Sequence, residues 1–357
     1  MIIIKVLGGL GNQLYQYALY EALKAAGREA LLDISAYLPK AKEPERRLLE
    51  LSKFPNVTYE TASQKEINRL LDISQNPAAK LRRAFTRFRN KDAVFGKIYK
   101  EQEGFCGEVF EREDCYLDGF WQNERYFAGI WPALVEKLEF PLDGLDFVNR
   151  ENLRNISKER SVGIHIRRTD YVDKDHEWRY GGICTFAYYQ KAVEYAGKAD
   201  NYYLFTDDPL YALQNAEKIL PQGTKFTLCD WNQGTHSFFD MMLMAACSVM
   251  ICANSSFSCW GARLPDPLRD GREKWLPDLK MVGKSGGLFD APVKREEPDP
   301  SEGSKEKKEE ESHVSETKLK IRPFKMDNTQ TRSLETVQED WPGWVFIDET
   351  GKIRSSL

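Results

Sequence analysis

The hydrophobic pattern at the start of the chain predicts a strand, a tight turn, a helix and a second strand. The apolar run IIIKVL at residues 2–7 is typical of a buried strand, and GGLGNQ at residues 8–13 predicts the turn that follows it. Apolar residues then recur at helical spacing until Gly27, which predicts the end of a helix. With the second apolar segment, at residues 29–35, this pattern indicates a βαβ-like opening of an α/β unit.

The segment between residues 40 and 130 has a weaker periodicity. Ser63 and Glu66 have the spacing of a capping box, which predicts the start of a helix. The basic stretch KLRRAFTRFRNK at residues 80–91 allows two interpretations, a solvated helix face or a surface that touches acidic membrane lipids.

From about residue 160 strands and helices alternate clearly. Thr185 has the residue type of an N-cap, and Asp208 followed by Pro209 has the sequence of a helix start. This alternation predicts a second doubly wound unit, in which ligands bind at the carboxyl ends of parallel strands. The predicted strands are residues 160–166, 201–207, 225–229 and 249–253, and the predicted helices are residues 185–198, a helix from Asp208, and residues 236–247.

The two units predict an α/β fold with two Rossmann-like domains that face each other across a cleft, residues 1–150 and 155–290. Residues 293–320 are charged and nearly without aromatic or aliphatic side chains. Such a segment cannot bury enough apolar surface to offset its ordering entropy, which predicts a disordered insertion. The apolar run at residues 340–348 predicts that a C-terminal segment, residues 330–357, packs back on the core.

The composition narrows the class of protein. With 357 residues, 41% of them hydrophobic, the chain can bury the cores of two globular domains. A formal net charge of −4 gives no electrostatic reason to expect a nucleic-acid partner. The seven cysteines form no C-x-x-C pair, which argues against a disulfide framework and a structural zinc site. The first apolar run is too short for a membrane span and lacks the features of a signal peptide, so we expect a cytoplasmic protein.

The sharpest local signal is HIRRTD at residues 165–170, where a predicted strand ends. Arg167 and Arg168 leave the carboxyl edge of a parallel sheet, and the guanidinium fork matches phosphate with two hydrogen bonds. The segment therefore predicts an anion site, although the same residues would also suit a solvated Arg–Asp surface pair.

The glycine turn is a second candidate for ligand binding. Gly9 and Gly11 match part of a dinucleotide fingerprint, but Leu14 stands at the position of its third glycine. Asn12 would lie beside a ligand at the helix start. A tight strand–helix turn that needs glycine for its geometry alone explains the same residues.

The segment ANSSFSCWGA at residues 253–262 predicts another strand–helix turn with polar side chains. Asn254, Ser255 and Ser256, with free backbone N–H groups, would suit phosphate oxygens at a helix N-terminus. Ordinary N-capping explains the serines equally well. Asp240 stands on a mainly apolar helix, where it would either accept the two N–H donors of a guanine edge or face water.

We predict no metal site. FTDD at residues 205–208 is not a spaced D-x-D, and the D-x-D at Asp173 and Asp175 is a triplet that arises readily by chance in a charged loop. The four histidines leave little for metal binding, and neither a Ser-His-Asp nor a Walker motif is recognisable.

Five motifs in order resemble the α-1,2-fucosyltransferase family. They are GGLGNQLYQYA (8–18), DGFWQNERYF (118–127), VGIHIRRTDYV (162–172), FTDD (205–208) and ANSSFSCWGARL (253–264). The resemblance implies a GT-B-like fold with an acceptor-side N-terminal domain and a second domain that binds a GDP-sugar. It also implies GDP-β-L-fucose as the donor substrate, inversion at the anomeric carbon, and no metal or other cofactor.

The resemblance further implies roles for individual residues. Arg167 and Arg168 would bind the β-phosphate, and Asn12 would lie close to the transferred sugar. His165 and Asp240 would lie near guanine and ribose. The full set of implied donor-binding residues is Gly9, Gly11, His165, Arg167, Arg168, Asp240, Asn254, Ser255 and Ser256, and the implied catalytic residues are Asn12, Arg167 and Asp170.

The mechanism we expect is a direct displacement with strong oxocarbenium character, in which the 2-hydroxyl of an acceptor galactose attacks. If bond breaking runs well ahead of bond making, the attacking hydroxyl needs little help from a base. The candidates for a base are Asp170, His176 and Glu177. We expect a β-galactose-terminated glycan acceptor, free or lipid-linked, and at most peripheral contact with the inner face of a membrane.

Two other functions stay open at this point. The chain could bind a GDP-sugar without catalysis, in which case nucleotide would bind and no sugar would move. It could also transfer another GDP-hexose. A dehydrogenase is disfavoured because the glycine turn lacks its third glycine.

Overall fold

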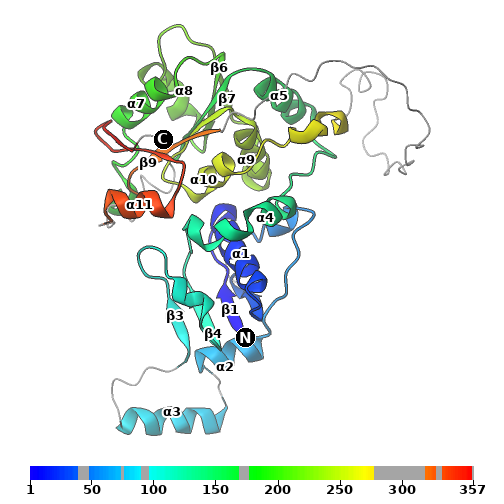
Figure 1. Ribbon diagram of the computed structural model, residues 1–357, viewed down its shortest axis with the longest axis vertical. Coiled ribbons are helices and arrows are strands. Elements are labelled where there is room, and N and C mark those ends of the chain that lie inside the picture. Colours follow the sequence, from blue (N-terminus) through cyan, green and yellow to red (C-terminus); the bar gives the residue numbers. More distant parts are fainter. Residues whose placement is uncertain are drawn as a thin grey trace, which may run out of the picture.

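The computed structural model describes several stretches of the chain, and the structural statements below concern these stretches. They are residues 1–38, 48–73, 76–89, 96–168, 177–276, 318–326 and 332–355. The described residues form two α/β units, an N-terminal unit and a larger second unit that also receives the C-terminal residues (Figure 1).

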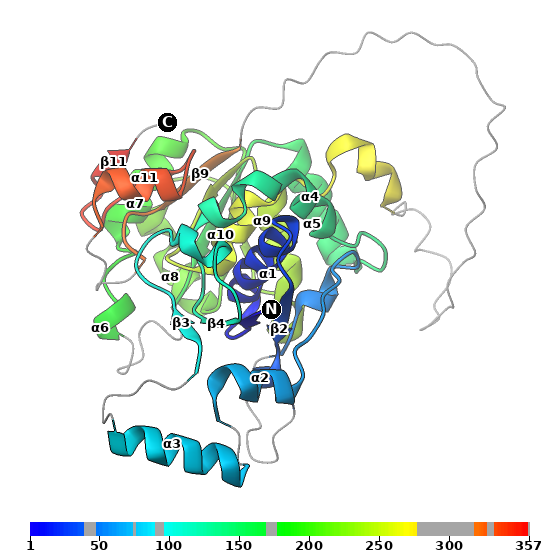
Figure 2. The ribbon, with the colours of Figure 1, turned by 60° about the horizontal axis from the view of Figure 1, so that its bottom comes forward.

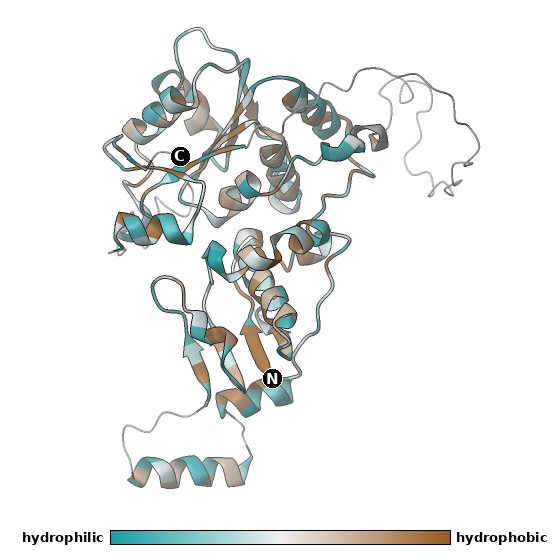
Figure 3. Cartoon of the chain, viewed as in Figure 1, coloured by the Kyte–Doolittle hydropathy of each residue, from teal (hydrophilic) through white to brown (hydrophobic). Residues whose placement is uncertain are grey.

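The N-terminal unit is built on a parallel four-stranded sheet. Its strands are β1 (Ile2–Lys5), β2 (Ala30–Asp33), β3 (Ile98–Lys100) and β4 (Cys115–Asp118), in the order β2-β1-β4-β3, and its helices include α1 (Leu10–Ala25) and α2 (Gln64–Leu71). Ile2 and Ile4 belong to the main core with α1, whereas Ile3 packs with Ile67 of α2. Since alternate residues of a strand face opposite sides, α1 and α2 cover opposite faces of the sheet, and β1 is strongly hydrophobic over its three isoleucines (Figure 3).

The second unit is built on a seven-stranded sheet. Its strands are β5 (Ser161–Ile166), β6 (Asn201–Thr206), β7 (Phe226–Cys229), β8 (Val249–Ile251), β9 (Leu319–Pro323), β10 (Val345–Ile347) and β11 (Ile353–Ser355). The strand order is β11-β10-β9-β8-β5-β6-β7, and every pair is parallel except β10 with β11.

Helices cover both faces of this second sheet. They are α5 (Phe147–Lys158), α7 (Phe186–Ala196), α8 (Pro209–Ile219), α9 (Ser237–Ala246) and α10 (Ser256–Arg263). Ile164 of β5 shares a core cluster with Tyr188 of α7 and Ala212 of α8, whereas Phe205 of β6 belongs to the cluster that contains Met241 of α9. One parallel and one mainly parallel sheet, each with helices on both faces, confirm the predicted GT-B-like architecture of two Rossmann-like units.

Further helices complete the described part of the chain. The remaining helices are α3 (Pro77–Arg89), α4 (Trp131–Lys137), α6 (Glu177–Tyr180) and α11 (Leu334–Asp340). The 3₁₀ helices are Ser35–Tyr37, Leu51–Lys53, Gly107–Phe110, Glu124–Tyr126, Ala128–Ile130, Gly234–His236 and Arg269–Trp275. Among the helices in the described stretches, we find none with the length and apolar content needed to cross a bilayer.

The three helix starts predicted from capping residues are confirmed. The side chains of Ser63, Thr185 and Asp208 each accept a hydrogen bond from a backbone N–H of the following first turn. At Ser63 the reciprocal bond from its backbone N–H to the Glu66 carboxylate is also present, at 2.7 Å. These starts depend on neighbouring residues only, which is why the sequence finds them.

The segment boundaries in the structure differ from the predicted ones in two places. The predicted boundary between residues 150 and 155 falls inside α5, a single continuous helix. The predicted insertion ended at residue 320, whereas Leu319 and Lys320 lie in β9, paired with β8 and β10. The rest of the predicted insertion lies outside the described residues.

Lys318, the charged residue directly before β9, is held by hydrogen bonds to the fold. Its ammonium group donates hydrogen bonds to the carbonyl oxygens of Met244, Ala245 and Gly261, at 2.8, 3.0 and 3.0 Å. A cation at carbonyls near a helix C-terminus is favourable because these groups carry the negative end of the helix dipole. Composition alone assigns such a lysine to solvent, and only the fold reveals its partners.

A shared core joins the two units. The ring centroid of Trp260 on α10 lies 5.0 Å from that of Tyr15 on α1. Beside it, the fully buried carboxylate of Glu124 pairs with Arg263 of α10 and accepts a 2.8 Å hydrogen bond from the indole N–H of Trp344. The motif at residues 118–127 therefore connects the N-terminal unit to α10 and to the C-terminal segment.

Candidate active site

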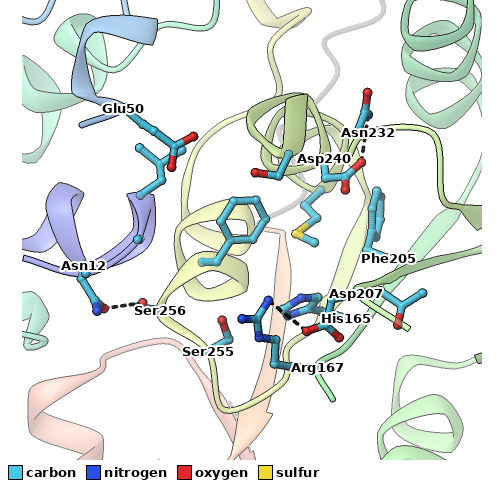
Figure 4. Close-up of a pocket in the computed structure, with 18 of the residues that line it drawn as sticks. Asn12, Glu50, His165, Arg167, Phe205, Asp207, Asn232, Asp240, Ser255 and Ser256 are labelled. Carbon is cyan, nitrogen blue, oxygen red and sulfur yellow. Dashed lines mark hydrogen bonds and ion pairs between the residues drawn. The ribbon is translucent and has the colours of Figure 1, made fainter. Parts of the chain in front are cut away.

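A cavity of about 510 Å³ lies between the two units (Figure 4). The N-terminal unit contributes the turn after β1, and the second unit contributes the ends of β5 and β6 and the starts of α9 and α10. This is the carboxyl edge of both parallel sheets, where open α/β folds bind ligands.

The turn between β1 and α1 presents backbone groups to the cavity. Gly8 has a φ of +88°, and its carbonyl accepts a 2.7 Å hydrogen bond from the hydroxyl of Tyr37. Gly9 is the N-cap of α1 and has no side chain to satisfy the first N–H groups of the helix. The positive end of α1 is therefore open toward the cavity.

Gly11 is required by a close approach of two helices. A β-carbon at this position would lie 2.5 Å from the backbone nitrogen of Phe257 on α10, far inside van der Waals contact. The starts of α1 and α10 thus meet backbone to backbone. Neither of the two sequence interpretations of this glycine, ligand contact or turn geometry, anticipated this reason.

The start of α10 faces the same cavity. Ser255 is its N-cap residue, yet its side chain makes no capping hydrogen bond, so ordinary N-capping does not account for this serine. Ser256 donates a 2.6 Å hydrogen bond to the amide oxygen of Asn12, which also accepts one of 2.8 Å from Gln122. With its oxygen held by two donors, Asn12 keeps its amide N–H groups for other partners.

The two arginines at the end of β5 have different surroundings. Arg167 lines the cavity, and its guanidinium lies 3.0 Å from the carboxylate of Asp207. The guanidinium of Arg168 instead stacks over the ring of Tyr211, 3.9 Å from its centroid, and Arg168 does not line the cavity. Asp207 also accepts a 2.8 Å hydrogen bond from the backbone N–H of Arg168, which fixes the loop between them.

His165 is neutral at physiological pH. Burial, with the positive charge of Arg167 beside it, lowers the pKa of His165 to about 4. Within the described residues its Nδ1 has no hydrogen-bond partner. A neutral imidazole at the cavity wall can hydrogen-bond a ligand without adding charge.

A chain of buried amides holds Asp240 at the opposite wall. The side chain of Asn232 donates a 2.9 Å hydrogen bond to Asp240, and Asn149 on α5 exchanges hydrogen bonds of 2.7 and 2.8 Å with Asn232 (Figure 4 draws the first of these). Burial raises the pKa of Asp240 to about 7, while the bond from Asn232 acts in the opposite direction. The carboxyl is thus fixed in position and titrates near neutral pH.

The structure brings most of the predicted site residues together. The predicted residues that line the cavity are Gly9, Gly11, Asn12, His165, Arg167, Asp240, Ser255 and Ser256. Arg168 and Asn254 do not line it, and the Asn254 amide donates instead to the carbonyl of Met326, at 3.3 Å. Asp170 and His176 lie outside the described residues, and Glu177 is exposed on α6.

The sequence interpretation missed several residues that line the cavity. Glu50 and Phe120 come from the N-terminal unit, and Asn232 comes from the loop before α9. Glu50 is held there because its backbone N–H donates a 2.8 Å hydrogen bond to the side chain of Gln13, a contact that spans 37 positions. Asp207 carried a signal, since FTDD ends a predicted strand, but no local pattern identifies the others.

A second cavity of about 280 Å³ adjoins the first, and Phe120 lines both. Its walls also include Gln122, which binds Asn12, and Arg322 of β9. Arg322 is 2% exposed, and its guanidinium stacks on Trp341, 3.8 Å from the ring centroid. Among the described residues, its Nε and Nη1 have no hydrogen-bond partner. Aromatic rings beside polar side chains suit a sugar.

The groups in the first cavity that attract an anion are the guanidinium of Arg167 and the open starts of α1 and α10. Within the described residues, no three His, Cys, Asp or Glu side chains gather where they could hold a metal ion. Asp173 and Asp175, the D-x-D considered above, lie outside the described residues.

Comparison with known proteins gives a family and two curated relatives. Residues 1–266 match the family model of glycosyl transferase family 11. The O-antigen biosynthesis glycosyltransferase WbnK of Escherichia coli is 26% identical over 293 residues, which cover 75% of this chain and 93% of the relative. An Alpha-1,2-colitosyltransferase of Escherichia coli is 28% identical over 268 residues, which cover 74% of this chain and 87% of the relative.

Solved structures resemble the chain more distantly. The NodZ alpha-1,6-fucosyltransferase soaked with GDP-fucose is 14% identical, with a TM-score of 0.36 and coverage of 74% of this chain and 92% of that one. POFUT1 in complex with GDP-fucose is 14% identical, with a TM-score of 0.39 and coverage of 73% and 93%.

Proposed function

The chain belongs to glycosyl transferase family 11, and from that premise we propose that it transfers L-fucose from GDP-β-L-fucose to the 2-hydroxyl of a terminal β-galactoside. The transfer inverts the anomeric carbon and uses no metal. The observation that carries the proposal is the convergence of Arg167 and the open starts of α1 and α10 on one cavity, opposite Asp240.

The charges in the cavity fit a nucleoside diphosphate donor. The diphosphate would bind Arg167 and the two helix starts, since both attract anions. The guanine edge presents two N–H donors, which the carboxylate of Asp240 accepts, and the neutral His165 also lines the cavity. The chain of amides through Asn232 and Asn149 keeps Asp240 oriented for this contact.

In the transfer step, the bond between the anomeric carbon and the β-phosphate oxygen breaks, and its electron pair stays with the diphosphate. Arg167 stabilises the charge that develops there, without reorganisation at the moment of reaction. The amide N–H groups of Asn12 hold the sugar and the departing oxygen, because Ser256 and Gln122 fix the amide oxygen on its other side.

The acceptor hydroxyl attacks from the face opposite the leaving diphosphate and transfers its proton to the carboxylate of Glu50 as the new bond forms. Glu50 is the cavity carboxylate contributed by the N-terminal unit, and its Oε1 lies 2.7 Å from the ammonium of Lys53. We place the acceptor sugar between Glu50 and the second cavity, where Phe120 forms the shared wall.

A second candidate donor is favoured by one of the relatives. The Alpha-1,2-colitosyltransferase transfers colitose, as its name says, and this chain is 28% identical to it. Colitose differs from L-fucose by the loss of the 3-hydroxyl, so the donor sugar is the feature that separates the two activities. A non-catalytic GDP-sugar-binding protein would bind either donor and transfer neither.

The test is GDP release from GDP-fucose, GDP-colitose and GDP-mannose, with EDTA present, across acceptors that do or do not end in β-galactose. The proposal expects release from GDP-fucose with the galactosides only. Release from GDP-colitose alone would replace fucose by colitose as the donor sugar. GDP binding without release on any acceptor would support the binding-protein alternative, and loss of activity in EDTA would contradict the metal-free mechanism.

A further inference from the structure

Helix α3 stands apart from the body of the N-terminal unit. It is separated from the rest of the fold in both views of the ribbon, below α2 in Figure 1 and Figure 2. None of its residues is buried. The side chains of Leu81, Phe85 and Phe88 are 72%, 60% and 87% exposed.

The exposed apolar residues of α3 form one face. Leu81, Phe85 and Phe88 follow the spacing i, i+4 and i+7, which places them on the same side of a helix. Burial of each such side chain in an apolar environment is worth about 1.5–3 kcal/mol, and in the described structure this gain is not made. A contiguous apolar face on an isolated helix indicates an interaction surface.

The remaining faces of α3 are basic. Within its thirteen residues the helix carries Lys80, Arg82, Arg83, Arg87 and Arg89 and no acidic residue. The whole chain has a net charge of −4, so this helix concentrates positive charge on an otherwise acidic protein. A long cationic side chain beside an apolar face can reach a phosphate while its stem lies along the apolar surface.

The base of α3 is tied to the fold through Asp72, which ends α2. Arg82 forms an ion pair with the Asp72 carboxylate, and Arg83 donates a 2.8 Å hydrogen bond to the Asp72 carbonyl. At about 100° per residue, Arg83 lies on the side of the helix away from Phe85 and Phe88, and Arg82 lies at the edge of the apolar face. The apolar face is therefore held outward.

We propose that α3 binds an anionic phospholipid surface, lying in the plane of the membrane with Leu81, Phe85 and Phe88 inserted between the headgroups. Lys80 and Arg89, which flank this face and are not paired with Asp72, then meet lipid phosphates. Charge complementarity selects this partner, because a second copy of α3 would present the same positive charge and would be repelled. The inference does not depend on the identity of the transferred sugar.

The experiment is co-sedimentation of the full chain with vesicles of phosphatidylcholine alone and vesicles that also contain phosphatidylglycerol. We expect binding to the anionic vesicles, weaker binding in high salt, and little binding to phosphatidylcholine. The variant Leu81→Ser/Phe85→Ser/Phe88→Ser should bind at least roughly tenfold more weakly, since it loses three inserted side chains. Its fold is checked by near-ultraviolet circular dichroism.

A matched control uses exposed apolar residues elsewhere. Leu210 and Leu213 on α8 are 65% and 54% exposed, and the variant Leu210→Ser/Leu213→Ser should bind vesicles like the unchanged chain. Equal binding by the α3 variant and the unchanged chain would overturn the proposal. So would a light-scattering mass that shows a dimer of the unchanged chain and a monomer of the α3 variant, because the face would then be an interface between copies.

Discussion

At the residue scale, the arginine pair after β5 shows how two adjacent side chains of one type come to differ. Arg167 points into the cavity beside Asp207, whereas the guanidinium of Arg168 lies on Tyr211. Successive residues after a strand point in different directions, which is why the two arginines differ. The motif does not show these directions and therefore assigns both arginines the same role. The difference is directly testable.

Arg167→Ala should lower kcat/KM by about 10²–10³-fold, because the variant loses the preorganised positive charge that stabilises the leaving diphosphate. Arg168→Ala is the matched control and should have a small effect, since its guanidinium does not line the cavity. Steady-state GDP release measures both. Equal losses in the two variants would mean that Arg168 also reaches the phosphate when donor is bound.

Asp240 predicts a pH dependence of donor binding. Burial raises the pKa of Asp240 to about 7, so the carboxyl gains a proton as the pH falls through that value and no longer accepts both guanine N–H groups. The KM for the donor should therefore rise about tenfold for each pH unit below 7. His165, whose pKa is lowered to about 4, stays neutral over this range.

Asp240→Asn provides the comparison for this profile. The variant should bind donor weakly at every pH. Its KM should be constant between pH 5 and 8, because the amide that replaces the carboxyl does not titrate. A flat KM profile in the unchanged chain would show that Asp240 does not accept from the donor.

At the element scale, the contact between the starts of α1 and α10 positions the cavity. The backbones touch at Gly11, and Asn12 receives the hydroxyl of Ser256 immediately beside that contact. One helix belongs to each unit, so their approach fixes where the two open helix starts lie relative to each other.

Gly11→Ala should lower the free energy of unfolding by about 1–3 kcal/mol and reduce turnover, because the new β-carbon separates the two helices. Gly129→Ala is the control, since a β-carbon at Gly129 would meet no atom within 4 Å. Urea unfolding and GDP release are measured for both variants. A Gly11→Ala protein with unchanged stability and turnover would contradict the importance of this contact.

At the scale of the whole molecule, the C-terminal residues complete the second sheet. β9 pairs with β8, and β10 and β11 extend the same sheet outward. The buried pair of Glu124 and Arg263, with the indole of Trp344, then connects this segment to the N-terminal unit. Residues beyond the family match at 1–266 are thus part of the core.

Lys318→Ala should lower the free energy of unfolding by roughly 3 kcal/mol, because three carbonyl oxygens of α9 and α10 lose a charged donor. Lys325→Ala is a suitable control, since the Lys325 side chain is 36% exposed and its ion pair with Glu349, at 3.5 Å, is of the surface type that contributes little stability. Denaturant unfolding monitored by tryptophan fluorescence compares them. Similar stability of the two variants would show that Lys318 is dispensable.

The sequence by itself determined the strands and helices of the clearly patterned segments and eight predicted site residues that line the cavity. Helix starts at Ser63, Thr185 and Asp208 depend on hydrogen bonds across three residues, and strands depend on short apolar runs, so local order suffices. The ends of parallel strands meet at one edge, which is why Asn12, His165 and the serines before α10 could be assigned to one site before their distances were known.

The tertiary structure alone decided which of these groups face the cavity and what surrounds them. Glu50, Phe120 and Asn232 reach the site through contacts between distant parts of the chain, and Lys318 finds its partners only after β9 has joined the sheet. Burial also sets the pKa of Asp240, since desolvation depends on every neighbour packed around the carboxyl. Long-range packing has no local signature in sequence, and that is the physical reason for the division.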